Sequence, residues 1–213
     1  MQHGKLFWSF AAIVSLNTLS AFVIFSSVTF WLFRFVILKK SDGFSEIASF
    51  DVAYQSVVVI MLITGATTSV ALQMFSGGKD KMMGVYKINM IINIVIVILF
   101  SFLFSCFSSE IMSLYGDEYV DSYYLIYVVC GMTIFATVNS INNKLFISNN
   151  NVGFIFINTI LSSIMSLLFV YIYSDIRASL LLSLSFFVYY FIFFIFDVGY
   201  ISFNYKRLFN EDK

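Results

Sequence analysis

The sequence predicts an all-α integral membrane protein, a single domain at residues 1–213 that folds as a bundle of six transmembrane helices. Two observations carry this prediction. Sixty per cent of the 213 residues are hydrophobic and only 11% are charged, against roughly 25% charged residues in an ordinary soluble domain. The apolar residues also form continuous runs that are long enough to cross a ~30 Å bilayer core as helices, rather than the ~10-residue alternating strands of a membrane barrel.

Charged and polar residues mark where each apolar segment ends. The first segment contains 28 charge-free residues between Lys5 and Arg34, which is too long for the apolar region of a secretory signal, about 7–15 residues. A Ser-Gly-Gly-Lys turn ends the second segment, and an amphipathic stretch from Phe107 to Tyr115 follows the third. Three asparagines at 149–151 separate the fourth from the fifth, and a polar turn at 174–177 precedes the sixth. The expected helices are 10–38, 52–75, 84–108, 122–147, 152–173 and 178–204.

The basic residues between these helices and near their ends predict the orientation, because cytoplasmic loops of membrane proteins are enriched in Lys and Arg. With the N-terminus in the cytoplasm, the outer side holds Lys39, Lys40 and Arg177. The inner side then holds Lys5, Lys79, Lys81, Lys144, Lys206, Arg207 and Lys213. Both termini are therefore expected in the cytoplasm.

Three charged residues inside the expected helices, Arg34, Lys87 and Asp197, are candidates for a functional role, because insertion of a charge costs roughly 2.5–3.5 kcal/mol. Arg34 and Lys87 lie near helix ends, from which long side chains reach the membrane surface. Asp197 has a short side chain and lies about 13 Å along the axis from Lys206, so we expect it to face the interior of the bundle. A pair between Asp197 and Lys87 is one hypothesis for how its charge is balanced, and both residues are candidate cavity residues.

Uncharged polar residues also cluster along single helix faces. Asn158, Ser162 and Ser166 do so in the fifth segment, and Thr64, Thr68 and Gln73 gather in the second. Two interpretations remain open: polar and small residues that hold membrane helices together, or the lining of a hydrated cavity.

The sequence gives no sign of an enzyme, a cofactor or a metal site. It lacks the common hydrolase, metalloprotease and nucleotide-binding motifs, it has a single histidine, His3, and its two cysteines lie singly in apolar segments. Asp117 and Glu118 in an outer loop are the one pair that resembles a catalytic site. Twelve basic residues balance twelve acidic ones, so the chain has no basic surface for nucleic acid.

Several stretches resemble the Wzx-type flippases of O-antigen and capsular polysaccharide, members of the multidrug/oligosaccharidyl-lipid/polysaccharide exporter superfamily. The resemblance covers residues 25–210, and the proline that the family often has near the end of the second segment is absent here. The stretches are Phe30–Arg34, Phe44–Gln55, Leu72–Ser76 with the basic loop Gly78–Lys81, and Ile111–Tyr119.

This resemblance implies the C-terminal half of a MATE-like exporter with two bundles, in the bacterial inner membrane. The implied function is translocation of undecaprenyl-diphosphate-linked oligosaccharide across that membrane, without enzymatic activity. The second bundle would come from an N-terminal half or a second copy. The implied substrate cavity involves Arg34 and the side of the second helix with Gln55, Thr64, Thr68 and Gln73. The alternatives are a multidrug or cation antiporter of the same superfamily, a membrane glycosyltransferase or polymerase fragment that uses Asp117 and Glu118, and a purely structural membrane subunit.

Overall fold

The computed structural model describes residues 32–34, 43–75 and 79–209, and these residues form helices and short connections with no β-strand. Residues 32–34 are helical, while the rest of the first expected helix, 10–38, lies outside the described residues. The elements are α2 (Gly43–Phe75), α3 (Lys79–Cys106), α4 (Ser108–Ser113), the 3₁₀ helix η1 (Asp117–Ser122), α5 (Tyr124–Ser148), α6 (Val152–Ile172), α7 (Ala178–Phe203) and α8 (Tyr205–Phe209).

Within the described part of the chain, five helices are long and apolar enough to cross a membrane: α2, α3 from Met82, α5, α6 and α7. The last three match the expected helices to within two residues at each end. The expected start of α2 at residue 52 is wrong, because the helix begins at Gly43. The prediction started this helix directly after the charged residue Asp51. Bilayer thickness limits the apolar run and not the helix itself, which continues beyond the apolar core.

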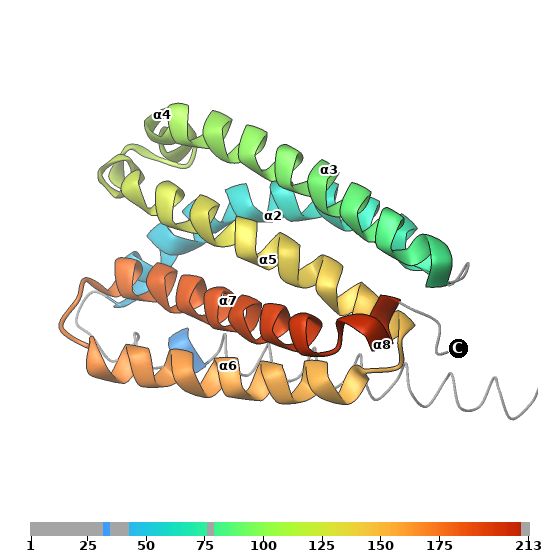
Figure 1. Cartoon of the computed structure of the whole chain (residues 1–213). Coiled ribbons are helices and arrows are strands. Elements are labelled where there is room, and N and C mark those ends of the chain that lie inside the picture. The colour runs from blue at the N-terminus through green and yellow to red at the C-terminus, as the bar shows by residue number, and fades with distance from the viewer. Residues whose placement is uncertain (1–31, 35–42, 76–78, 210–213) are drawn as a thin grey trace, which may run out of the picture.

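Helix α5 lies at the centre of the bundle and contacts α2, α3 and α7, while α6 packs mainly against α7 (Figure 1). In the most apolar stretch of α5, 61% of the residues are buried, whereas only 17% are buried in the most apolar stretch of α3. Helix α3 therefore turns most of its surface outward, as a helix at the edge of a membrane bundle does. The side chains on α5 consequently have neighbours on several sides, and the polar ones need partners there.

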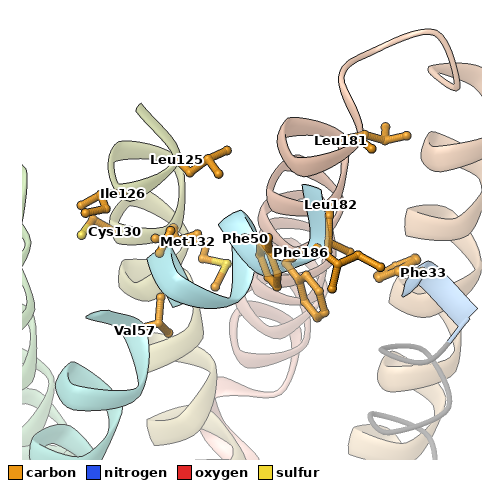
Figure 2. Close-up of a cluster of buried hydrophobic side chains, with 14 of the residues drawn as sticks. Phe33, Phe50, Val57, Leu125, Ile126, Cys130, Met132, Leu181, Leu182 and Phe186 are labelled. Carbon is orange, nitrogen blue, oxygen red and sulfur yellow. The ribbon is translucent and has the colours of Figure 1, made fainter. Parts of the chain in front are cut away.

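Two clusters of aromatic and aliphatic side chains hold the helices together. In the first, the Phe186 ring of α7 stacks on Phe50 of α2 at 5.6 Å between centroids and meets Phe33 edge-on at 5.4 Å. Figure 2 shows the three rings side by side, with Phe186 between Phe50 and Phe33. In the second cluster, Phe154 of α6 stacks on Tyr200 of α7 at 3.9 Å, and Phe146 of α5 packs edge-on against both rings. The clusters fix α7 against its neighbours near both of its ends.

One end of the bundle is tied by a single carboxylate. Glu46, in the first turn of α2, accepts a hydrogen bond of 2.9 Å from the backbone N–H of Ser179 in the first turn of α7. It also forms an ion pair with Arg177, the residue before α7, at 2.9 Å. The guanidinium of Arg177 lies 5.8 Å from the centre of the Tyr124 ring at the start of α5. The starts of α2, α5 and α7 therefore meet at this end, which the charge distribution predicts to be the outer one.

Candidate functional site

Asp197 lies in the interior of the bundle, fully buried at 0% exposure. Each of its carboxylate oxygens accepts a hydrogen bond from an asparagine on a different helix. Asn158 of α6 donates to Oδ1 at 2.9 Å, and Asn142 of α5 donates to Oδ2 at 3.2 Å. Neither ion pair between described residues involves Asp197. The carboxylate is therefore held by neutral amides and not by a cation of the described chain.

The two asparagines are themselves held in place by hydroxyl groups. Tyr86 of α3 donates a hydrogen bond of 2.8 Å from its hydroxyl to the side-chain oxygen of Asn142. Ser162 donates to the side-chain oxygen of Asn158 at 3.2 Å, and the amide of Asn158 also donates to the Phe193 carbonyl at 3.1 Å. We call the five side chains the Asp197 network: Tyr86, Asn142, Asn158, Ser162 and Asp197. They come from four helices.

The network forms one polar layer across the bundle. Asn142 and Asp197 lie six residues before the ends of α5 and α7, and Asn158 lies six residues after the start of α6. At about 1.5 Å per residue, all three are about 9 Å from the expected cytoplasmic end. The layer therefore lies within the apolar part of the helices but within a short distance of water.

A carboxylate in this setting is suited to binding a small cation. A bare negative charge inside a membrane bundle is costly, so a proton or a monovalent cation would stabilise the site. The side-chain amide of asparagine has a donor end and an acceptor end. Asn142 and Asn158 are thus able to offer N–H groups to the charged carboxylate, or oxygens to a bound cation.

Lys87 does not join the network. It is exposed on α3, whereas Asp197 is fully buried, so the structure does not bring the hypothesised pair together. The physical reason is helical geometry: Tyr86 points into the bundle, and the next residue along a helix projects about 100° away. Lys87 therefore lies on the outer side of α3.

Arg34 forms an ion pair with Asp51 of α2. Their side chains are 18% and 40% exposed, so the pair lies at the edge of the bundle and not in its centre. The pairing gives the guanidinium a carboxylate partner from this chain. An anionic substrate that reached Arg34 would compete with Asp51 for it.

The remaining cavity candidates of α2 lie on different faces of that helix. Thr64 and Thr68 are buried and donate to their own backbone, to Ile60 O at 3.1 Å and Gly65 O at 3.0 Å. Gln55 and Gln73 are exposed. The separation follows from helical periodicity, because Thr64 is about half a turn away from Gln55. The structure therefore does not gather these four side chains into one lining.

Asp117 and Glu118 are exposed in η1. Across the described ranges, no three His, Cys, Asp or Glu side chains come close enough together to hold a metal ion. Gly116 precedes the pair with a φ of 140°, and a Cβ built there would lie 2.6 Å from a Glu118 carboxylate oxygen. The glycine thus allows the tight turn that leads into η1.

Sequence reasoning found Asp197 and Asn158 but missed Asn142, Tyr86 and Asp51. Asn142 carried a usable signal, since it stands in an apolar segment where an amide needs a partner. Tyr86 carried none, because the chain has 13 tyrosines. Asp51 was placed outside the second helix, so its contact with Arg34 was not considered.

The site has to be judged from its own residues. The chain matches no protein-family model, no curated protein and no solved structure.

Proposed function

We propose that the chain is one bundle of a secondary exporter that moves a lipid-linked oligosaccharide from the inner to the outer leaflet of the bacterial inner membrane. The single observation that carries the transport proposal is the Asp197 network. A buried carboxylate without a cationic partner among the described residues is costly in a membrane and is characteristic of ion pathways and transport sites. A purely structural subunit has no need of such a group.

The nature of the substrate is supported by a different observation. The order and spacing of the stretches at residues 30–34, 44–55, 72–81 and 111–119 resemble Wzx-type flippases, whose substrate is an undecaprenyl-diphosphate-linked oligosaccharide. The second bundle that such an exporter needs would come from a separate N-terminal half or a second copy of the chain. Alternating access would then arise from movement of one bundle against the other.

In this proposal, loading and unloading of a cation at Asp197 favours different arrangements of the four helices that meet there. Arg34 contributes to recognition by exchanging Asp51 for the diphosphate of the substrate. The energy for transport comes from the cation gradient. The chain itself then needs no catalytic residue.

Gene deletion with complementation in the native host tests this function. The deletion is expected to cause complete lipid-linked repeat units to accumulate on the cytoplasmic leaflet and surface polysaccharide to disappear. The wild-type gene should restore the polymer, and Asp197→Asn should not. Asp175→Asn is the matched control, because Asp175 is an exposed acid in the α6–α7 turn. Unchanged lipid-linked glycans in the deletion strain would sink the proposal.

A multidrug or cation antiporter is the second candidate, and one observation favours it. Arg34 already has an anionic partner in Asp51, while the buried acid Asp197 has none of the opposite sign among the described residues. This charge arrangement also suits a cationic substrate. Loss of the gene would then increase sensitivity to cationic drugs and leave the glycans unchanged. Shortened repeat units in an Asp117→Asn strain would instead favour the glycosyltransferase alternative.

A further inference from the structure

The junction between α7 and α8 forms a concavity of about 410 Å³, lined by residues 202–207. The short helix α8 is anchored to the bundle by the buried side chains of Leu208 and Phe209. The Phe209 ring lies 5.6 Å from the ring of Tyr86 on α3. The walls of the concavity are thus positioned by packing against the rest of the molecule.

The concavity carries positive charge. Lys206 and Arg207 are both exposed and line it together with the exposed residue Ser202. Neither Lys206 nor Arg207 takes part in the ion pairs found between described residues, which are Arg34–Asp51 and Arg177–Glu46. An ammonium, a guanidinium and a hydroxyl are the side-chain groups that commonly donate hydrogen bonds to phosphate.

The end of α7 opposes this charge only weakly. The last carbonyls of a helix carry about half a negative charge in total. The Tyr200 carbonyl is satisfied here by two donors of Asn204, the backbone N–H at 2.9 Å and the side-chain amide at 3.1 Å. Among the described residues that line the concavity, the two full positive charges therefore outweigh the partial charge of the helix end.

An apolar track leads to the concavity along α7. Phe191, Ile195 and Val198 are exposed, and their spacing places them on the same helix face as Ser202. Phe203 is 92% exposed beside the concavity and adds apolar surface there. An apolar track that ends in a cationic pocket matches a molecule with a hydrocarbon chain and a phosphate group.

We propose that this concavity binds the phosphate group of an anionic lipid from the adjacent leaflet, with the lipid chain along the α7 track. Zwitterionic choline lipids are disfavoured because their ammonium group is repelled by Lys206 and Arg207. The inference needs only that the bundle lies in a membrane. It is independent of the oligosaccharide substrate proposed above.

Native mass spectrometry of the full chain in detergent tests the site, with phosphatidic acid and phosphatidylcholine of identical acyl chains as probes. Phosphatidic acid is expected to bind saturably and more tightly. One basic residue near a membrane surface contributes about a fivefold change in affinity. Lys206→Gln and Arg207→Gln should therefore each weaken binding about fivefold, and the double variant about 25-fold.

Lys144→Gln, at the same end of α5, is the matched control and should bind as the wild type does. Lys206→Arg should also retain binding, which separates loss of charge from disturbance of α8. Unchanged phosphatidic acid binding in the double variant would overturn the proposal, as would equal binding of phosphatidylcholine. Saturable binding of inorganic pyrophosphate without lipid, lost in the same variants, would show a site for a free phosphate compound and overturn the lipid assignment.

Discussion

At Asp197 the two carboxylate oxygens are bound by two asparagines, and each asparagine is held by a hydroxyl group. The stability of this site depends on matched donors and acceptors and not on opposite charges. Removing one donor leaves a buried acceptor without its partner. Removing donor and acceptor together avoids that cost.

Asn158→Ala should therefore lower the free energy of unfolding by about 1–2 kcal/mol. In an Asp197→Ala background the same substitution should cost about 0.5–1.5 kcal/mol less, because the carboxylate is no longer there to be left unpaired. Unfolding of the four proteins of this double-mutant cycle in detergent measures the difference. Equal costs in both backgrounds would contradict the network as described.

At the residue scale, the sequence was sufficient to identify Asp197 but not its partners. A short charged side chain within an apolar segment has to face the interior of the bundle, and its position in the sequence alone predicts this. Its partners depend on how the helices are rotated and packed. Lys87 illustrates the limit, since a neighbouring position on the same helix, Tyr86, reaches the network in its place.

At the scale of elements, Glu46 joins α2 to α7 in two ways. It accepts a hydrogen bond from an otherwise unpaired N–H in the first turn of α7 and it pairs with Arg177. The first contact resembles a helix cap, and loss of a cap costs about 0.5–2 kcal/mol. The second involves an arginine side chain that is 48% exposed, and such surface pairs contribute about 0–1 kcal/mol.

Glu46→Ala should consequently destabilise the protein by about 1–2 kcal/mol, and Arg177→Ala by less. Glu46→Gln keeps a side-chain oxygen for the Ser179 N–H and should fall between them. Unfolding at low and high salt separates the contributions, because salt weakens the ion pair and leaves the cap largely intact. A larger effect of Arg177→Ala than of Glu46→Ala would refute this ranking.

The elements themselves were predictable where a turn signal coincides with the end of an apolar run. The asparagines before α6 and the polar turn before α7 place both helix starts correctly. The start of α2 was not predictable in this way. Its first turns are stabilised by contacts with Arg34 and with the start of α7, which are distant in the sequence.

At the scale of the whole molecule, the natural cysteines report on orientation. Cys106 is exposed at the end of α3, and Cys130 is buried in α5. The charge distribution predicts that the end of α3 lies on the outer side. A membrane-impermeant maleimide applied to intact cells should therefore label Cys106 and not Cys130, and Cys106→Ser should abolish labelling. Labelling of Cys106 only in inverted vesicles would show that the orientation is the opposite of the predicted one.

The position of Asp197 in α7, after α5 and α6 in the chain, also affects how the protein is made. Asn142 and Asn158 emerge from the ribosome before Asp197, so α5 and α6 are in the membrane before α7 arrives. An isolated α7 would have to insert an unshielded carboxylate, which costs roughly 2.5–3.5 kcal/mol. In the growing chain the side-chain amides of Asn142 and Asn158 are already in the membrane and able to donate hydrogen bonds to this carboxylate. Packing of α7 against α5 and α6 and shielding of its carboxylate are therefore the same event during biogenesis.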